Sequence, residues 1–294
     1  MPELPDIAIY LEALEARTAG QPIAGVRIVN PFVLRTVQPS IDALTGRVVR
    51  GYRRIGKRIV METEGALFLV MHLMIAGRLR WRAPGGTVAR PAPLARFEFA
   101  DGVLVLTEAG KKRRASLHLV QGEAALAQFD RGGLEPLQST VAQVATRLRR
   151  ENHTLKRALT DPRLFSGIGN AYSDEILHRA RLSPLLLTSR ITDLQVAALR
   201  DATVTVLEEW TARIRAECAG EFPETVTAFR EGMTVHGRYG QPCPVCGAPV
   251  QRIRYADNET NYCARCQTGG RLLADRAMSR LLKADWPRTL EDAG

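Results

Sequence analysis

The first residues after the initiator methionine could carry out covalent chemistry. If Met1 is removed, as is usual before a small second residue, the nitrogen of Pro2 becomes the amino terminus. An α-amino group has a pKa of about 7.7–8.0, so a useful fraction is unprotonated near neutral pH and can attack an electrophilic carbon. Attack on an aldehyde-level carbon by a proline gives a positively charged iminium, which favours elimination, and Glu3 could move the protons involved. The alternative is that proline is merely a common second residue.

Four cysteines in the last quarter of the chain have the spacing of metal ligands. Two C-x₂-C pairs, separated by sixteen residues, consist of Cys243, Cys246, Cys263 and Cys266. Thiolates two residues apart on a tight turn can face one ion, and two such pairs complete a tetrahedral site. The pattern predicts one structural Zn²⁺, with iron in the same geometry or a pair of disulfides as alternatives. Because a closed four-sulfur site has no open position for substrate, we expect the metal to organise a hairpin and not to perform chemistry.

The chain is strongly basic. Its 294 residues include 41 Lys and Arg against 31 Asp and Glu, so the net charge is 41 − 31 = +10. This balance indicates a polyanionic partner and favours nucleic acid, although each basic run taken alone could be a solvated surface. No segment has the roughly 20 apolar residues that span a bilayer, and no apolar signal core follows the N-terminus. We therefore expect a cytoplasmic protein without a membrane partner, which acts as a monomer.

The elements of the first half must position the terminal amine. Apolar residues recur at helical spacing directly after Pro5, so one helix follows the amine at once. Between residues 26 and 120 the pattern changes to short apolar runs with turns, and the Asp101-Gly102 step between two such runs predicts a tight hairpin. We therefore predict an N-terminal β-sandwich domain with a leading helix over residues 1–130.

The second half has helical periodicity. Residues 131–150 are expected to form a linker and the start of a helical region, which continues over residues 151–234. Between its helices, the segment Gly167-Ile-Gly169-Asn170 predicts a glycine-rich turn that feeds a helix, and the N-terminus of such a helix can hold a phosphate. The alternative is a helix–helix turn that needs flexible glycines for its backbone alone.

The remaining residues form a finger and an extension. The cysteine pairs predict a zinc finger over residues 235–270. In the extension, residues 271–294, the spacing of Leu273, Ala277 and Leu281 predicts a short amphipathic helix. This helix either packs back on the domain or contacts a partner or DNA.

These features resemble, in their order, the formamidopyrimidine-DNA glycosylase/endonuclease VIII family of base-excision repair enzymes. The resemblance extends from Pro2 to Gln267 and is far more specific than any single motif. The most specific elements are the opening PELPD, Lys57 in Gly-Lys-Arg, His72 in Met71-His-Leu, the segment GIGNAYSDEIL, and Tyr262-Cys-Ala-Arg-Cys-Gln267.

The resemblance implies an α+β multidomain fold with an N-terminal β-sandwich, a helix-two-turn-helix domain and a C-terminal Cys₄ zinc hairpin. It also implies a bifunctional DNA glycosylase and AP lyase acting on DNA that contains damaged bases or abasic sites. Pro2 would form a Schiff base at the sugar C1′, and β,δ-elimination would follow. Glu3 would be the general acid/base, and Lys57 would contact a phosphate near the reacting sugar and assist. The target nucleotide must leave the duplex, because stacking hides its sugar carbon.

Contacts to DNA follow from the same resemblance. Asn170 matches the residue that holds the phosphates flanking the lesion, and Lys156 falls near another contact to phosphate or lesion. His72, in its family motif, belongs to the same set of expected DNA contacts. Asn258 stands five residues before the third cysteine, where members commonly carry an arginine that grips phosphate. At that position this chain therefore offers a neutral contact.

The chain departs from the formamidopyrimidine branch in two further regions. Ile75 stands where a side chain enters the duplex and can still act as an apolar wedge. The second wedge loop, here Glu108–Ser116, has no aromatic residue, and its cations Lys111, Lys112 and Arg113 are expected to hold the unpaired strand instead.

Other parts of the recognition surface also differ. Arg252 or Arg254 could substitute for the missing arginine of the zinc hairpin. The stretch Gly220–Gly240 is shorter than the loop that covers oxidised guanine in that branch, which argues against specificity for 8-oxoguanine.

Two other functions are compatible with parts of the sequence. A protein that binds damaged, abasic or branched DNA without excising a base would explain the altered wedge and hairpin, but it would not need a free proline amine. A zinc-ribbon protein that binds RNA or the ribosome would explain the charge and the cysteines, but not the N-terminus.

Overall fold

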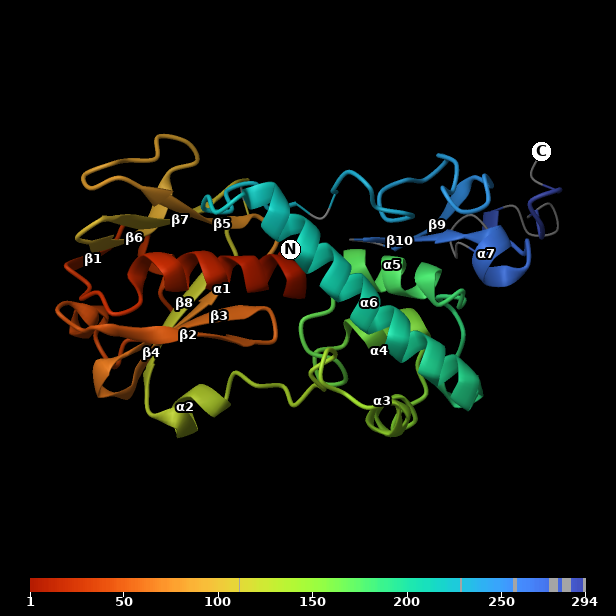
Figure 1. The fold of residues 1–294 in the computed structure, drawn as a ribbon, viewed down its shortest axis with the longest axis horizontal. Helices are drawn as coiled ribbons and strands as arrows, with labels where there is room; N and C mark the ends of the chain where they lie inside the picture. The colour runs from red at the N-terminus through yellow and green to blue at the C-terminus, as the bar shows by residue number, and fades with distance from the viewer. Residues whose placement is uncertain (111, 228, 256–257, 275–279, 282–286, 293–294) are drawn as a thin grey trace. The chain divides into compact units, whose positions relative to one another are not determined.

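The chain forms two compact units of mixed α and β structure. The computed structural model describes all residues except 111, 228, 256–257, 275–279, 282–286 and 293–294 (Figure 1). The first unit consists of Met1–Arg131 and Trp210–Thr227, and the second consists of Gly132–Glu209 and Ala228–Gly294. The predicted α+β class is confirmed.

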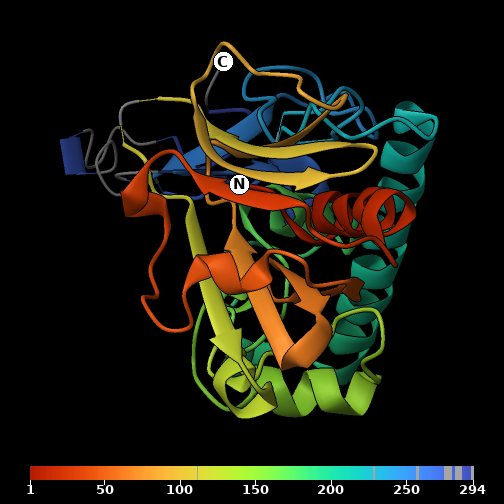
Figure 2. The same cartoon turned by 90° about the vertical axis from the view of Figure 1, so that its left-hand side faces the viewer.

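The first unit is a sandwich of two antiparallel sheets of four strands each (Figures 1 and 2). The strand order of one sheet is β1 (Gly25–Ile28), β6 (Pro93–Phe99), β7 (Gly102–Glu108) and β5 (Gly77–Arg82). The order of the other is β2 (Val49–Ile55), β3 (Arg58–Thr63), β4 (Leu67–His72) and β8 (Ser116–Gln121). Short helical segments join or follow the strands: η1 (Pro31–Val33), η2 (Ile41–Leu44), η3 (Glu64–Ala66) and α2 (Glu123–Ala127). The predicted β-sandwich is therefore confirmed.

Strand β7 shows why a continuous apolar run becomes a strand here. All its residues are buried, because it lies between β6 and β5 and is covered on both faces. Leu104 and Leu106 enter the core shared by the two sheets, whereas Val103 and Val105 pack with Val88 on the other face. A strand with two covered faces has no polar alternation, so only its length and its flanking turns identify it in the sequence.

The predicted Asp101-Gly102 hairpin joins β6 to β7. Glycine is required at its second position by a close approach, since a Cβ atom on Gly102 would lie 2.4 Å from Cζ2 of Trp81. The turn thus fixes both the reversal of the chain and the packing of β5 against it.

Helix α1 (Leu4–Thr18) holds the start of the chain at one edge of the sandwich (Figure 2). Ile7, Tyr10 and Leu14 recur on one face and are fully buried in the core between the sheets. The helix begins with a capping box in which the backbone N–H of Glu3 donates to Oδ2 of Asp6 at 2.9 Å. Cap and core together leave the first residues little freedom.

The second unit is helical up to the cysteine-rich finger. Its helices and strands are α3 (Val141–Leu148), α4 (Leu155–Thr160), α5 (Asn170–Arg179), η4 (Thr188–Arg190), α6 (Asp193–Cys218), β9 (Val250–Arg254), β10 (Glu259–Cys263) and α7 (Ala264–Thr268). The end of α6, from Trp210, belongs to the first unit. A capping box opens α6: the N–H of Thr192 donates to Gln195 Oε1 at 3.0 Å, and the N–H of Gln195 donates to Thr192 Oγ1 at 3.3 Å. Helix α3 occupies part of the segment expected as a linker.

The described residues that follow the finger pack back against the finger. The N–H of Leu273 donates to Oη of Tyr262 at 2.7 Å, and the Leu273 side chain is buried with Ile253 of β9. The residues 275–279, which include Ala277 of the expected amphipathic helix, lie outside the described residues. Leu281, the third residue of that pattern, is exposed.

Candidate nucleic-acid interface and metal centre

The amino terminus and the turn between β2 and β3 meet in the first unit. Pro2 and Glu3 are buried at the start of α1, and Glu3 is 3% exposed. Burial lowers the pKa of the Met1 amino group from its usual 8.0, and the positive charges of Arg78 and Lys57 lower it further, whereas Glu3 raises it. The Met1 amino group, next to Pro2, thus lies within electrostatic reach of Glu3 and Lys57. Where burial lowers the pKa of a terminal amine, a larger fraction of it is unprotonated near neutral pH.

His72 ends β4 and holds the turn that follows. Its Nδ1 accepts a hydrogen bond from the N–H of Met74 at 3.0 Å, so the ring hydrogen is on Nε2. Burial lowers the pKa of His72 to about 4, and the charges of Arg58 and Lys57 act in the same direction. The imidazole is therefore neutral at physiological pH, and it can contact a phosphate only as a neutral Nε2–H donor.

The turn from Leu73 to Gly77, which we call the Ile75 turn, presents one apolar side chain. Ile75 is 63% exposed. The N–H of Gly77 donates to the carbonyl of Leu73 at 2.8 Å, and Arg78 Nη1 donates to the carbonyl of Ile75 at 3.1 Å. A Cβ on Gly77 would lie 2.2 Å from the Leu73 carbonyl oxygen, so this closure needs glycine. A rigid turn with an exposed isoleucine at its tip has the form of a wedge.

The loop after β7 carries exposed cations on an anchored base. Glu108 is buried, and its carboxylate accepts hydrogen bonds from the N–H groups of Arg114 at 2.9 Å and Ala115 at 3.0 Å. Lys112 and Arg113 are exposed between these anchors. Lys111, expected to contact DNA with them, lies outside the described residues. The sequence reasoning missed the anchoring role of Glu108, which only the contacts of its carboxylate reveal.

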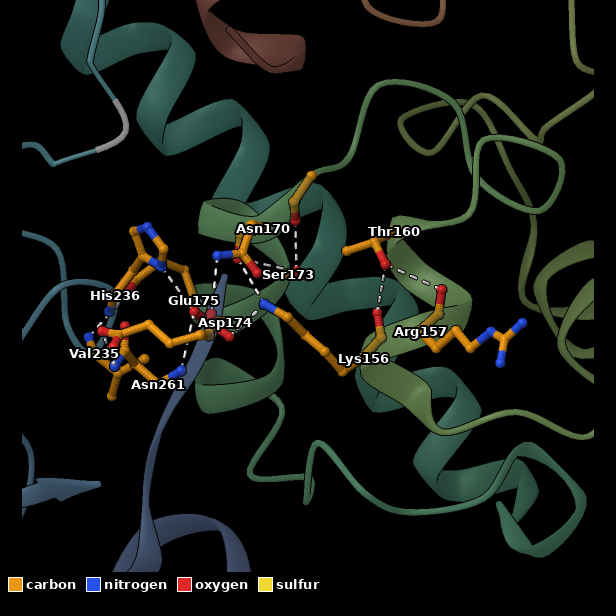
Figure 3. A network of polar contacts seen from close by, with 12 residues as sticks. Lys156, Arg157, Thr160, Asn170, Ser173, Asp174, Glu175, Val235, His236 and Asn261 are labelled. Atoms are coloured by element: carbon orange, nitrogen blue, oxygen red, sulfur yellow. Dashed lines mark hydrogen bonds and ion pairs between the residues drawn. The ribbon is translucent and has the colours of Figure 1, made fainter. Parts of the chain in front are cut away.

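In the second unit, Asn170 begins α5 and is held from two sides (Figure 3). Its side-chain Nδ2 donates to the carbonyl of Glu259 in β10 at 2.9 Å. Its own carbonyl accepts a hydrogen bond from Lys156 Nζ at 2.7 Å. Asn170 therefore has a fixed position at the helix N-terminus, where the first backbone N–H groups favour an anion.

Lys156, which is expected near a contact to phosphate or lesion, is buried. The residue is 8% exposed, and its ammonium lies 2.5 Å from Oδ1 of Asp174 (Figure 3). Burial of a lysine requires such a partner, because an isolated ammonium in the interior is strongly disfavoured. In this structure the buried Lys156 side chain positions the turn Gly167–Asn170, which we call the Asn170 turn.

Asp174 joins three elements of the second unit. Besides Lys156 in α4, its carboxylate contacts Nδ1 of His236 at 2.7 Å and accepts a hydrogen bond from the N–H of Asn261 in β10 at 3.2 Å (Figure 3). Sequence reasoning missed this network. No motif spacing could have indicated it, because the partners of Asp174 lie from 18 to 87 positions away in the sequence.

Glu175, the next residue, binds the segment before the finger. Its two carboxylate oxygens accept hydrogen bonds from the backbone N–H groups of Thr234, Val235 and His236 at 2.8, 2.9 and 2.9 Å (Figure 3). Three N–H donors compensate the buried carboxylate without a cation. Helix α5 thus positions both the Asn170 turn and the start of the finger.

The four predicted metal ligands come together. The Sγ atoms of Cys243 and Cys266 lie 4.0 Å apart, and those of Cys246 and Cys263 lie 3.4 Å apart. Zinc–sulfur bonds of about 2.3 Å in a tetrahedron place sulfur atoms about 3.8 Å apart. The donor set and its dimensions therefore fit one zinc ion, which would join the Cys243 turn to the β9–β10 hairpin and its following helix.

His178 lies at the same cluster and was not predicted from the sequence. Its Nε2 is 3.4 Å from Sγ of Cys243, and its ligand atoms, like those of Cys263 and Cys266, lie within 4.8 Å of the others in the group. His178 comes from the last turn of α5, far from the cysteines in the sequence, so no motif spacing could have indicated it.

The tip of the zinc hairpin carries Asn258, which is exposed and accepts a hydrogen bond from the N–H of Tyr255 at 2.8 Å through its carbonyl. Arg252, one suggested substitute for the missing arginine, has its guanidinium 4.0 Å from the centre of the Tyr239 ring. It also lies 3.7 Å from Glu259. Arg252 is therefore held along the hairpin, whereas Arg254 is exposed.

Family models match three successive parts of the chain. The formamidopyrimidine-DNA glycosylase N-terminal domain matches residues 1–118, the H2TH domain of the same enzyme matches residues 133–216, and the zinc finger found in FPG and IleRS matches residues 240–269. A β-sandwich, an H2TH unit and a four-cysteine zinc finger in this order define a multidomain class of nucleic-acid-binding proteins. None of the helices in the described part of the chain is long and apolar enough to cross a membrane.

Whole-chain comparisons agree with these matches. The chain is 33% identical over 281 residues to the formamidopyrimidine-DNA glycosylase of Heliobacterium modesticaldum, which covers 91% of this chain and 100% of the relative. It is 40% identical over 151 residues to an uncharacterized formamidopyrimidine-DNA glycosylase-like protein of Mycobacterium tuberculosis, covering 51% of this chain and 94% of that protein. The chain belongs to the formamidopyrimidine-DNA glycosylase family.

Solved structures of the family are similar over the same length. The Lactococcus lactis formamidopyrimidine-DNA glycosylase in complex with DNA containing an abasic site gives a TM-score of 0.80 at 25% identity, covering 90% of this chain and 99% of that one. A mutant of the same enzyme in complex with DNA containing Fapy-dG gives a TM-score of 0.79 at 26% identity, covering 91% and 100%.

Proposed function

We propose that this protein is a base-excision-repair DNA glycosylase that also cleaves the strand as an AP lyase. The observation that carries the proposal is the position of Pro2, which is buried at the start of α1 directly before Glu3, itself 3% exposed. A protein that only binds DNA has no use for a nucleophilic amine. The relatives and solved structures of glycosylases support the glycosylase part of the proposal.

In the proposed reaction, removal of Met1 exposes the nitrogen of Pro2, which attacks C1′ of an extruded nucleotide. The N–C1′ bond forms as the glycosidic bond breaks, the departing base takes up a proton, and the proline nitrogen loses its own. The C1′–O4′ bond of the sugar then breaks, O4′ takes up a proton, and the nitrogen lone pair forms the iminium. The iminium withdraws electrons, so C2′ gives up a proton and the C3′–O bond breaks. A second elimination removes a proton from C4′ and breaks the C5′–O bond. Glu3 moves protons at the sugar, and Lys57 neutralises a neighbouring phosphate.

Other residues would hold the DNA. Asn170, at the N-terminus of α5, would bind phosphate, and neutral His72 would donate a hydrogen bond through Nε2. Ile75 would fill the space left by the extruded nucleotide, and Lys112 with Arg113 would hold the opposite strand.

Borohydride trapping tests the proposal. With duplexes that carry oxidised purines, oxidised pyrimidines or an abasic site, we expect a covalent adduct on at least one substrate. Peptide mapping should place the adduct on the nitrogen of Pro2. Absence of an adduct on every substrate, the abasic site included, would leave non-excising DNA binding as the function. Retention of Met1 in active protein would exclude Pro2 as the nucleophile.

Glu3 has a matched control on the same helix. Glu3→Gln should lower the rate of base release about 10²–10⁴-fold, because it removes the general acid/base. Glu12→Gln removes a carboxylate that is exposed and lies 2.7 Å from Arg215, and it should leave the rate unchanged. Equal rates in the two variants would remove Glu3 from the mechanism.

A further inference from the structure

His178 lies against the cysteine cluster without belonging to the C-x₂-C pairs. It is 6% exposed, Cys243 is 1% exposed, and Nε2 lies 3.4 Å from Sγ of Cys243. This separation suits a hydrogen bond from N–H to sulfur. Because both residues are buried, water cannot readily take the place of either partner.

We propose that His178 donates its Nε2–H to the Cys243 thiolate and thereby strengthens zinc retention. Four thiolates around Zn²⁺ carry two net negative charges, and a buried site with this charge is stabilised by hydrogen bonds to the sulfur atoms. His178 is a positioning residue in this role: it acts on the metal through a ligand and does not touch DNA.

The cysteines differ in which groups donate hydrogen bonds to their sulfur atoms. Cys246 is reached by the backbone N–H of Ala248, and Cys263 by the backbone N–H of Cys266. Such backbone donors belong to the same tight turns that carry the cysteines. Cys243 instead has a side-chain donor on α5, the helix that also carries Asn170 and Asp174. The hydrogen bond therefore ties the zinc site to the helix that positions the proposed phosphate contact.

His178 is placed outside the coordination sphere by the completeness of the cysteine set. The sulfur separations of 3.4 and 4.0 Å suit a tetrahedron of four cysteines. A fifth ligand is not needed in a structural zinc site. The competing arrangement is a Cys₃His site in which His178 replaces Cys246, since His178, Cys243, Cys263 and Cys266 also lie close together.

Zinc competition separates the two roles of the histidine. In His178→Leu, which removes the donor but keeps an apolar side chain of similar size, we expect about 10–100-fold weaker zinc binding in a titration against a chromophoric chelator. His178→Gln keeps an N–H donor and should recover part of the loss. His153→Leu, at a half-buried histidine of the same unit whose Nε2 contacts Glu151, is the control and should match the wild type.

Two further readouts are local to the site. In His178→Leu, the reaction of Cys243 with iodoacetamide should accelerate relative to the wild type more than that of Cys246, as mapped by mass spectrometry, because only Cys243 loses its donor. The cobalt-substituted variant should keep the absorption spectrum of a four-thiolate site, whereas Cys246→Ser should lose it.

Several results would overturn the proposal. Equal zinc affinity in the wild type and His178→Leu would do so, and so would a cobalt spectrum that changes in His178→Leu but not in Cys246→Ser, which would make His178 a ligand. If His178→Leu fails to fold in excess zinc, His178→Gln decides: unimpaired folding with wild-type zinc affinity supports a donor role, and zinc loss equal to a ligand deletion refutes it. All measurements use the full chain without DNA, so they are independent of glycosylase activity.

Discussion

The Asn170 turn and the Ile75 turn are both held in a fixed conformation, but by different chemistry. The Asn170 turn is held by buried charges: the Lys156 ammonium binds the Asn170 carbonyl at 2.7 Å and Asp174 at 2.5 Å. The Ile75 turn is held by backbone hydrogen bonds, by the neutral imidazole of His72 and by one hydrogen bond from the Arg78 guanidinium to the Ile75 carbonyl, with no buried ion pair among these contacts. One turn therefore depends on an ion pair and the other does not.

This difference follows from what each turn is proposed to present. A phosphate contact needs backbone and amide donors in a fixed position, and a buried ion pair sets that position accurately at the cost of desolvating two charges. A wedge needs only shape, and backbone closure around glycine is sufficient. We therefore expect the first turn to be sensitive to loss of charge, and the second to be sensitive to loss of side-chain volume.

The largest effect should come from breaking the ion pair. Asp174→Asn leaves the Lys156 ammonium buried without a carboxylate and should lower the free energy of unfolding by about 3–5 kcal/mol. Urea denaturation measures this directly. Glu209→Gln, at an exposed pair with Arg179 in the same unit, should cost less than about 1 kcal/mol. Similar losses in both variants would show that the network does not carry the charge dependence of this turn.

A smaller and more selective effect is expected at the other turn. Ile75→Ala should reduce base release from duplex DNA about tenfold, because an unfilled helix recloses on the extruded nucleotide, and should leave single-stranded DNA unaffected. The exposed side chain contributes little to folding, so thermal stability should not change. Val37→Ala, at another exposed apolar residue of the first unit, is the control. An equal loss on single strands would exclude a wedge.

Sequence patterns predicted the secondary-structure elements and the chemistry of these regions better than they predicted the side chains that hold them in place. Pro2, Glu3 and the four cysteines are recognisable because their chemistry requires their position or spacing. The strand of continuous apolar residues that became β7, and the capping box at Thr192, follow from local rules. Asp174, Glu175 and His178 were missed because their roles depend on partners that are distant in the sequence, such as His236 at separation 62 and Cys243 at separation 65.

Lys156 illustrates the same limit. The fold places its ammonium against Asp174, and burial cannot be read from residue type alone. Lys112 and Arg113 are exposed as expected for loop cations. The Glu108 carboxylate holds the base of this loop. The exposure of the two cations beyond it is compatible with an adaptable contact to the strand.

The neutral state of His72, which holds the Ile75 turn, can be tested by pH. Its folded pKa of about 4 lies below the unfolded value near 6.5, so between these values the unfolded state binds more protons. Stability from this group is present above about pH 6.5 and is lost as the pH falls toward 4. His72→Gln should therefore show a shallower loss of unfolding free energy over this range. Nitrogen NMR should find the Nε2–H form of His72 down to about pH 5, and a ring protonated near pH 6.5 would contradict the assignment.

The smallest effect should be a change in salt dependence. Lys112→Ala removes one exposed cation from the loop anchored by Glu108, and a lost phosphate contact lowers the slope of log K against log salt by about 0.9 on duplex DNA. Arg27→Ala, in β1 at the opposite edge of its sheet from β5, should leave the slope unchanged. If the two variants changed the slope equally, the positive charge would act as a diffuse field, and the loop would have no contact of its own. If only Lys112 matters, the loop holds the strand by contact while the Ile75 turn acts by shape.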